Sequence, residues 1–403
     1  MKKIALVTYA LNVGGMETFM LGLARQLRTE GLEPTFVITD SIGPWHDKPR
    51  SEDFDVLSIV QSTWQSRITH TKNVAECLKQ FDVVLLNHSA SAQSSLGLLP
   101  ESLVAIPILH NDDEAIYSVG LSNEDNIDIV VTVSERLRTQ AIARGMPAER
   151  VFCISNGVEV FPDFPKESRS VGNNGPLRIA FIGRIVHRQK GVFYLPGILG
   201  KLSARNIPVR MDIIGSGSDL ESLRERVAAA DINAQVRFHG ALPHEDAMRL
   251  LQDADVLIMP SHYEGQGIVL LEAMARAVVP VVSHLQGITN VVIANGVNGI
   301  LVPVGDEEGL AGALAHLADD RQRLECMAKA AWQATLNRYS LGIMAKQYLS
   351  LIEECCEKRR QGKMPSRSGE LYFSLLGRHP RVPLGLSAAA SVVMNRFSFW
   401  SPI

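Results

Sequence analysis

Short apolar runs alternate along this chain with longer stretches whose apolar positions recur at helical spacing. In the first part of the chain the apolar runs are residues 3–8, 34–38, 82–87, 105–109 and 129–133, and the first helical stretch is residues 17–30. Short, continuous apolar runs are typical of parallel strands buried on both faces, and their alternation with helices is typical of βαβ units. The pattern predicts an α/β protein with a doubly wound parallel sheet.

The alternation stops at a polar segment rich in proline and glycine, residues 161–176, and then begins afresh. We interpret this segment as an interdomain linker. The strands predicted after it are residues 178–182, 209–214, 236–239, 256–259, 279–283 and 299–302. We therefore expect two Rossmann-like domains, at residues 1–165 and 177–340. Because ligands of such sheets bind beyond the carboxyl ends of the strands, we expect the two domains to share a cleft.

Two regions depart from the alternation. Residues 41–71 are rich in proline and serine, and we expect an irregular segment there with one strand at residues 55–59. Residues 341–403 form a third region, in which we expect a helix at residues 341–360 that returns to the first domain. The end of this helix begins a basic and aromatic tail, with Lys358, Arg359, Arg360, Lys363, Arg367, Arg378, Arg381, Arg396, Tyr372, Phe373, Phe397, Phe399 and Trp400. Such a tail is compatible with an anionic membrane surface, and a partly disordered chain end is the open alternative.

Composition limits the class of protein. The chain of 403 residues is 46% hydrophobic and 21% charged, a normal globular balance, and its net charge of −3 argues against nucleic acid as a partner. The five cysteines have no metal-ligand spacing and suit a reducing compartment. The apolar run at the N-terminus is too short for a signal peptide, and no run is long enough to span a bilayer. We expect a cytoplasmic protein, with peripheral attachment to the inner face of the membrane as an open alternative.

Residues 261–275 hold the most informative chemistry. After a predicted strand, Gly265 and Gly267 open a loop, and a predicted helix begins at Ile268. The N–H groups of such a helix start attract anions, yet Glu264 and Glu272 would repel a bare phosphate. Carboxylates accept hydrogen bonds from hydroxyl groups, so a nucleotide-sugar, with a diphosphate between two polyols, fits both features. The alternative is that Glu264 caps the helix and Glu272 is a solvated surface acid.

Seven residues separate the two acids, and this spacing resembles the E-x7-E signature of retaining GT-B glycosyltransferases, in particular glycosyltransferase family 4 (glycosyl transferases group 1). From about residue 177 to 338, the order of Gly-Arg, Lys-Gly, Gly-Ser-Gly, Phe-His-Gly, Pro-Ser, the two acids and Asn-Gly is similar to that family's C-terminal domain. The N-terminal half matches more loosely. The resemblance implies a GT-B fold, with two Rossmann-like doubly wound domains that face each other across a cleft. Where the family commonly has glycine, this chain has Ala277, and we expect no loss of activity from it.

Two cations follow the first strand of the second domain. Arg184 and Lys190 lie where a parallel strand ends, and fixed cations neutralise the charge of a leaving diphosphate without a metal. The resemblance gives both residues that catalytic role, whereas Arg188 matches neither. It also implies that Glu264 orients the donor sugar and that Glu272 holds the ribose hydroxyls.

The resemblance implies further donor-binding positions, Gly265, Gly267 and Ile268. Gly215 and Gly217 border the diphosphate in similar enzymes, but a packing role and a phosphate-facing role are both open. In the first domain, Gly14 and Gly15 join a strand to a helix, where the backbone can approach a ligand closely. His110 ends the predicted strand at residues 105–109 and matches the family histidine that touches the transferred sugar.

The implied activity is transfer of a hexose-type sugar, with retention, from a nucleotide-sugar to a glycan or lipid-linked acceptor, in cell-surface polysaccharide biosynthesis. We expect no cofactor and no metal, because the Asp-x-Asp at Asp253 and Asp255 precedes a strand and lies away from the carboxyl ends. We expect His239 to be structural. It does not discriminate uracil from guanine, and we favour a UDP-linked over a GDP-linked donor. Other GT-B chemistry such as nucleotide-sugar epimerisation, a non-catalytic glycan-binding subunit and an NAD-dependent oxidoreductase are the alternatives.

Overall fold

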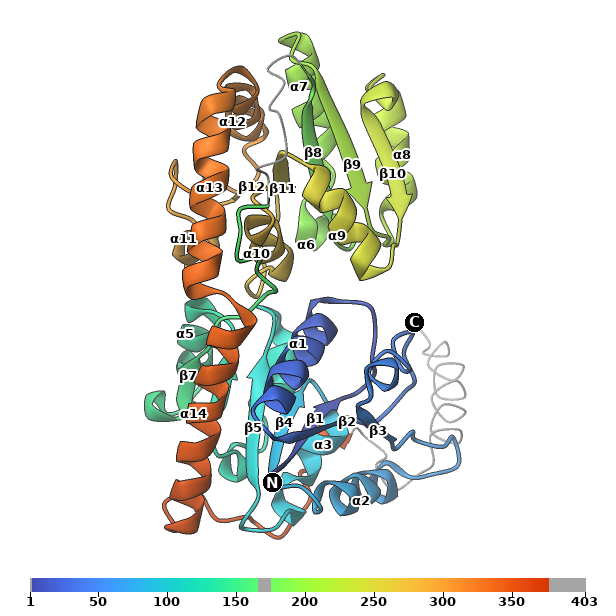
Figure 1. Ribbon diagram of the computed structural model, residues 1–403. Helices are drawn as coiled ribbons and strands as arrows, with labels where there is room; N and C mark the ends of the chain where they lie inside the picture. Colours follow the sequence, from blue (N-terminus) through green and yellow to red (C-terminus); the bar gives the residue numbers. More distant parts are fainter. Residues whose placement is uncertain (1, 166–174, 377–403) are drawn as a thin grey trace, which may run out of the picture. The chain divides into compact units, whose positions relative to one another are not determined.

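Two parallel sheets organise the chain (Figure 1). The structure, a computed structural model, describes residues 2–165 and 175–376, and it divides into two units. Unit 1 contains the described residues up to Val133, Leu137–Ile154 and those from Ala345 onward. Unit 2 contains Ser134–Arg136 and Ser155–Met344.

The described part of unit 1 has a seven-stranded sheet with the order β3-β2-β1-β4-β5-β6-β7, and all its paired strands are parallel. Its strands are β1 (Lys3–Thr8), β2 (Glu33–Ile38), β3 (Asp55–Ser58), β4 (Val83–Asn87), β5 (Val104–Leu109), β6 (Val130–Thr132) and β7 (Val151–Cys153). The helices between them are α1 (Gly15–Thr29), α2 (Arg67–Leu78), α3 (Ala90–Ser95), α4 (Glu114–Gly120) and α5 (Glu135–Ala143). The last long helix, α14 (Leu341–Arg360), has the predicted bounds.

The described part of unit 2 has a six-stranded parallel sheet with the order β10-β9-β8-β11-β12-β13. Its strands are β8 (Leu177–Ile182), β9 (Val209–Ile214), β10 (Val236–Gly240), β11 (Val256–Met259), β12 (Val279–Ser283) and β13 (Ile300–Val302). Its helices are α6 (His187–Lys190), α7 (Tyr194–Ala204), α8 (Leu220–Ala229), α9 (His244–Asp253), α10 (Ile268–Ala275), α11 (Thr289–Val292), α12 (Glu307–Asp319) and α13 (Arg321–Arg338). Short 3-10 turns in the chain are η1 (Arg50–Glu52), η2 (Leu96–Leu98), η3 (Glu124–Asn126), η4 (Ala148–Arg150), η5 (Asn233–Gln235) and η6 (Ser374–Leu376).

Alternation of side chains along β8 explains why helices cover both faces of the unit 2 sheet. Ile179 and Phe181 belong to a core cluster with residues of α7, α8, α12 and α13. Ala180 belongs to a second cluster with residues of α9 and α10. Successive side chains of a strand point to opposite faces, so a strand with apolar residues at every position needs a helix layer on each side. The predicted doubly wound architecture is confirmed for both sheets.

The predicted elements are found with small shifts at their ends, and two are corrected. α2 begins at Arg67, inside the segment predicted to be irregular, where Ser66 caps it by accepting the Thr69 N–H at 3.1 Å. A serine cap of this kind is favourable because it satisfies a backbone donor that the helix leaves open. The Arg184–Lys190 stretch, for which no helix was predicted, ends in the helical turn α6.

Ala277 follows α10 in the left-handed region, with φ of 56°, and is fully buried. Glycine is favoured at this position because a Cβ in the left-handed conformation costs about 1–2 kcal/mol. This backbone requirement explains why glycine is common there in similar chains. The methyl group affects stability and lies at the far end of α10 from Gly267.

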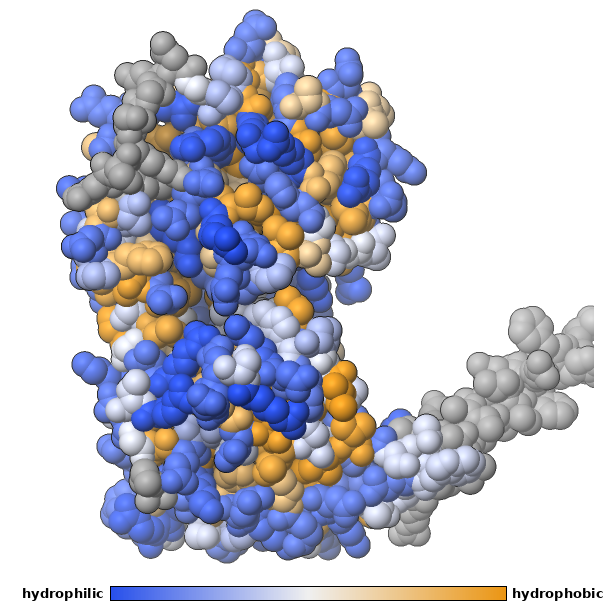
Figure 2. All heavy atoms as spheres, turned by 45° about the vertical axis from the view of Figure 1, so that its right-hand side comes forward, coloured by the Kyte–Doolittle hydropathy of each residue, from blue (hydrophilic) through white to orange (hydrophobic). Residues whose placement is uncertain are grey.

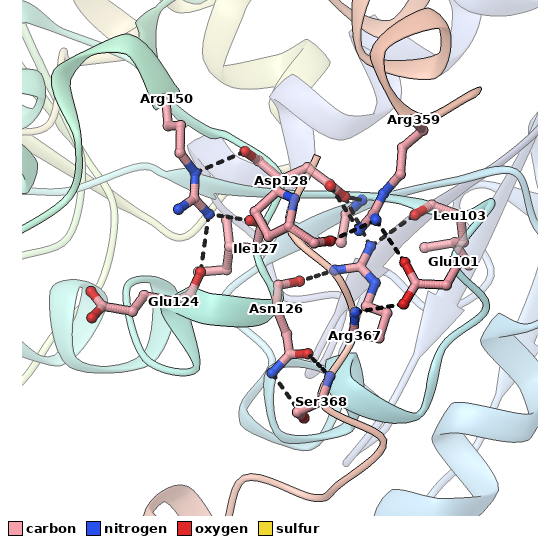
Figure 3. Close-up of polar contacts among 12 residues, drawn as sticks. Glu101, Leu103, Glu124, Asn126, Ile127, Asp128, Arg150, Arg359, Arg367 and Ser368 are labelled. Carbon is pink, nitrogen blue, oxygen red and sulfur yellow. Dashed lines mark hydrogen bonds and ion pairs between the residues drawn. The ribbon is translucent and has the colours of Figure 1, made fainter. Parts of the chain in front are cut away.

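Part of the basic tail is internal to unit 1, which corrects the prediction for two of its arginines (Figure 3). Arg359 and Arg367 form ion pairs with the fully buried Asp128 at 2.8 and 2.9 Å. Asp128 also accepts the N–H of Ala105, in β5, at 2.7 Å. Glu101 contacts the same two arginines at the surface. Because their charges are matched inside the fold, Arg359 and Arg367 are not available to a membrane surface.

The remaining tail prediction rests on residues outside those described. Arg378, Arg381, Arg396, Phe397, Phe399 and Trp400 all lie beyond residue 376, and part of the predicted linker, residues 166–174, is likewise outside. Over the residues that the structure does describe, no helix has both the length and the apolar character needed to cross a bilayer.

Candidate functional site

Loops that follow three neighbouring strands meet at the carboxyl edge of the unit 2 sheet. β8 lies between β9 and β11, and the strand order reverses direction there. α/β proteins bind ligands at such a topological switch point. The three loops are residues 183–191, which include α6, 215–217 and 260–267. They contain the predicted donor-site residues of unit 2 except Ile268 and Glu272, which belong to α10.

Gly215 and Gly217 bring the β9 loop directly against the β8 loop. A Cβ atom on Gly215 would lie 1.9 Å from the carbonyl oxygen of Gly183, and one on Gly217 would lie 2.2 Å from that of Ile185. Any side chain at either position would therefore displace the backbone around Arg184. The sequence left a packing role and a phosphate-facing role open, and the structure shows that packing alone requires both glycines.

Lys190 and Glu264 form a buried ion pair. The Lys190 Nζ lies 2.6 Å from Oε1 of Glu264, and the two side chains are only 13% and 5% exposed. The Ser261 hydroxyl donates to the same oxygen at 2.7 Å. These contacts contradict the helix-capping alternative for Glu264, because its carboxylate is bound to side chains and Gly267, the N-cap of α10, receives no side-chain cap. In the described contacts of Glu264 the second oxygen, Oε2, is left to accept from a ligand.

Arg184 lies at the exposed side of the same loop. Its Nη2 donates to Oε1 of the buried Gln189 at 2.5 Å, which holds the guanidinium against the β8 loop. A guanidinium has five N–H donors in a planar fork, so one such contact leaves most of them for an anion. Arg184 and Lys190 thus belong to one short segment, with Gln189 between them.

Glu272 is 7% exposed and lies 2.6 Å from Nε2 of His244 through its Oε1. The surface-acid alternative is therefore wrong for Glu272. Gly267, in the left-handed conformation with φ of 80°, turns the chain into α10 at Ile268. The first N–H groups of a helix have no intrahelical partner, and the positive end of the helix dipole favours negative charge there. The start of α10 therefore combines an anion-binding helix end with a buried acid one turn into the helix.

In unit 1, Gly14 and Gly15 lead from the β1 loop into α1. Glu17, in the first turn of α1, folds back to accept the N–H of Asn12 at 3.0 Å and is 4% exposed. A Cβ atom on Gly14 would lie 3.0 Å from Oε2 of Glu17, so a small residue fits best. Burial raises the pKa of Glu17, against the opposing effect of backbone hydrogen bonds. The loop between β1 and α1 is thus held by a side chain of the helix that follows it.

His110 follows β5, beside the switch point of the unit 1 sheet. Its Nε2 lies 2.8 Å from Oδ1 of Asn87, whose amide nitrogen is bound to backbone carbonyls of Val7 and Leu85. Because Oδ1 can only accept, Nε2 carries the proton. Burial, with a smaller contribution from His88, lowers the pKa of His110 to about 3. The ring is therefore neutral at physiological pH, with Nδ1 as an acceptor.

Comparison with known proteins decides the family. Residues 163–334 match the family model described as glycosyl transferases group 1, and residues 13–160 match that of glycosyltransferase family 4. The chain belongs to glycosyltransferase family 4.

The names of two relatives of this family-4 chain refer to different glycoconjugates. Phosphatidyl-myo-inositol mannosyltransferase of Mycolicibacterium smegmatis is 36% identical over 211 residues, 50% of this chain and 51% of the relative. The lipopolysaccharide core biosynthesis glycosyltransferase LpsE of Rhizobium meliloti is 25% identical, over 84% of this chain and 96% of the relative. The match thus spans about half the length of the first relative and nearly all of the second.

Among solved structures, HepE of Anabaena in complex with UDP and glucose aligns with a TM-score of 0.75 and 18% identity. The alignment covers 88% of this chain and 100% of HepE. At this identity the likeness concerns the fold. The family-4 chain has the GT-B fold that the sequence predicted.

Sequence reasoning missed several histidines of this family-4 chain. His244 was not considered, yet it contacts Glu272. His88 follows β4 with a φ of 55°, unusual for a residue with a side chain, and its ring contacts Tyr9 edge-on. His262 lies between two recognised positions of the motif and bonds the Lys190 segment. These partners could not be found in the sequence, because they lie far from the histidines along the chain, 28 residues for His244 and 74 for His262.

The Asp-x-Asp of the family-4 chain lies at the amino end of β11. Asp255 accepts two hydrogen bonds from the Arg178 side chain, at 2.7 and 3.2 Å, and a third from the backbone N–H of Arg178. The carboxylate therefore joins β11 to the start of β8, at the edge of the sheet opposite the three loops. His239, predicted to be structural, lies 2.7 Å from Asp212 of the neighbouring strand.

Proposed function

We propose that this family-4 chain transfers a hexose-type sugar, with retention at the anomeric carbon, from a nucleotide-sugar to a glycan or lipid-linked acceptor in cell-surface polysaccharide biosynthesis. The observation that carries the proposal is the buried Lys190–Glu264 pair at the switch point of the unit 2 sheet. A cation suits a diphosphate and a carboxylate suits sugar hydroxyls, so the pair matches both parts of the donor. A UDP-linked donor is favoured, because the related HepE was solved with UDP-glucose.

The leaving diphosphate is stabilised in this proposal by Arg184, Lys190 and the amides of Gly267 and Ile268. Negative charge grows on the bridging phosphate oxygen as its bond to the sugar breaks, and preorganised donors in a partly desolvated site stabilise that charge strongly. Lys190 exchanges part of its contact with Glu264 for the phosphate. This role needs no metal ion, since the protein's own cations supply the charge.

Glu264 orients the sugar hydroxyls and Glu272 holds the ribose hydroxyls. The acceptor hydroxyl forms the new bond at the anomeric carbon on the face from which the diphosphate departs, and the leaving phosphate oxygen takes the acceptor's proton. Glu264 is therefore no covalent nucleophile, and the two-carboxylate mechanism of glycosidases does not apply. In unit 1, neutral His110 offers Nδ1 as a hydrogen-bond acceptor to a sugar hydroxyl, and Gly14 and Gly15 let a ligand approach the backbone closely.

Unit 1 takes the acceptor in this proposal, and unit 2 takes the donor. Figure 2 shows apolar residues at the surface among residues that are mostly polar. Large exposed apolar residues occur in the loops after β1, β2 and β3: Val13, Ile42, Val60 and Trp64. These loops lie at one edge of the sheet, since their strands are parallel neighbours. An amphipathic acceptor would fit this edge. In this proposal the protein works in the cytoplasm, peripherally at the inner face of the membrane.

The proposal is tested by nucleotide-sugar binding and by transfer. We expect UDP-sugars to raise the melting temperature of the purified protein, because a ligand that binds only the folded state stabilises it by mass action. Incubation of a radiolabelled donor with a membrane extract should then label a glycan or lipid fraction. Label that stays in an altered free nucleotide-sugar would indicate epimerisation, and failure to bind any nucleotide-sugar would indicate a non-catalytic subunit.

Glu272→Ala should weaken UDP binding by about 10- to 150-fold, the loss of one hydrogen bond to the ribose, with little change in turnover at saturating donor. The reason is that a carboxylate accepting ribose hydroxyls forms charge-assisted hydrogen bonds, each worth about 1.5–3 kcal/mol. Isothermal titration with UDP and with pyrophosphate measures the effect, since pyrophosphate has no ribose and should bind both proteins alike. Equal affinity of the variant and the parent for UDP would remove the ribose role.

A further inference from the structure

His262 connects the loop after β11 to the segment that carries Lys190. Its backbone N–H donates to the carbonyl oxygen of Gln189 at 2.8 Å. Its ring Nδ1 lies 3.0 Å from the carbonyl oxygen of Arg188, and its Nε2 lies 2.8 Å from the hydroxyl of Tyr194. One residue thus holds the Lys190 segment at three points, on both sides of the lysine.

The hydrogen-bond partners fix the tautomer of the neutral ring. The Arg188 carbonyl can only accept, so Nδ1 carries a proton. In the neutral ring Nε2 is then an acceptor, and the Tyr194 hydroxyl donates to it. Phenol, imidazole and carbonyl therefore form a chain of two bonds in one direction, Tyr194 to His262 to Arg188.

The two backbones are in direct contact beside this chain of bonds. Gly191 has a φ of 63°, and a Cβ atom there would lie 2.0 Å from the carbonyl oxygen of Pro260. The His262 ring also meets His187 and Tyr194 edge-on, with centroids 5.1 and 5.4 Å apart. The bonds of His262 therefore lie beside the point where the two loops are in direct backbone contact, at Gly191 and Pro260.

We propose that His262 and Tyr194 are positioning residues, which fix Lys190 relative to Glu264 and thereby set the cation for the donor diphosphate. The inference rests on the proposed function, because it assigns the diphosphate to Lys190. Neither side chain touches the diphosphate in this account. Each acts through the backbone of Arg188 and Gln189, and the distance it controls is the 2.6 Å between Lys190 Nζ and Glu264 Oε1.

The test compares UDP with uridine, by titration calorimetry, in Tyr194→Phe, His262→Asn and His262→Ala. Tyr194→Phe removes one bond, and His262→Asn removes the same bond while its amide still donates to Arg188. Each should weaken UDP binding about fivefold, as expected for loss of one neutral hydrogen bond. His262→Ala removes both ring bonds and should weaken it about tenfold or more. Uridine has no phosphate, so its affinity should not change.

A double variant separates coupling from general damage. Tyr194→Phe in the His262→Ala background should have no further effect on UDP affinity, because the bond it removes is already absent. His316→Ala, at an exposed position of α12, is the matched control and should bind UDP as the parent does. The positioning role alone would be overturned if all three variants bound UDP as tightly as the parent does. It would also be overturned if they lost the same factor in affinity for UDP and for uridine. A parent protein that does not bind UDP would overturn the proposed donor as well.

Discussion

Replacing Lys190 with alanine should lower the turnover of sugar transfer by about a hundredfold, the effect of removing one group that stabilises charge in the transition state. Lys190 is 13% exposed, and a cation in such a site is screened little by water. Charge on the leaving diphosphate is greater in the transition state than in the bound donor. The loss should therefore be larger in kcat than in donor affinity.

The measurement is initial rate against donor concentration, with unfolding followed in parallel. Lys190→Ala leaves Glu264 buried with Ser261 as its remaining side-chain partner, so some loss of stability is expected too. Lys201→Ala is a suitable control, because Lys201 is a partly exposed lysine of α7 that pairs with Glu308. It should retain parental kinetics. Lys190→Ala with parental turnover would remove the leaving-group assignment even if its melting temperature fell.

Arg184→Ala provides a second measurement of how strongly the protein's cations stabilise the charge on the leaving diphosphate. Its side chain is exposed and bound to Gln189, so its removal does not leave a buried charge unpaired. A loss of turnover in Arg184→Ala without a loss of stability would therefore isolate the catalytic contribution. Comparison of the two variants separates chemistry from folding at this site.

The sequence predicted strands well because their pattern is local. β9 and β11 have the predicted bounds. β9 has apolar residues at alternate positions and ends before Gly215, and β11 is a continuous apolar run that ends before Pro260. β7 was missed, although β6 and β13 are equally short and were predicted. α2 was missed in part because Ser66, Thr69 and Thr71 are of types common in loops, whereas here Ser66 caps the helix and both threonines belong to it.

Long-range partners could not be predicted from local pattern. The sequence placed Lys190 and Glu264 in one site because both occur in family motifs, and the structure brings them into contact. The partner of Glu272, His244, is 28 residues away along the chain and has no motif. The basic tail shows the same limit, because Arg367 meets Asp128 across 239 residues. A count of charges cannot reveal that a cation is matched inside the fold.

Asp128→Asn should destabilise unit 1 by about 3–5 kcal/mol, the cost of breaking a buried ion pair by removing one partner. Asp128 is fully buried, and Arg359 and Arg367 are each 3% exposed, so two guanidinium groups would lose their shared counter-charge. Burial already lowers the pKa of Arg367, and Asp128 opposes this effect. The substitution keeps the size of the side chain, so the change measures charge and not volume.

Urea unfolding followed by far-UV circular dichroism measures this change, with Glu101→Gln as the matched control. Glu101 contacts the same arginines, but its side chain is 61% exposed, and a surface pair contributes about 0–1 kcal/mol. A large effect for Asp128 and a small one for Glu101 would show that the buried charge holds the segment after α14 in place. A change below about 1 kcal/mol for Asp128→Asn would contradict this role of the buried charge. Arg359 and Arg367 would then reach water readily, and both would again be cations that an anionic surface could bind.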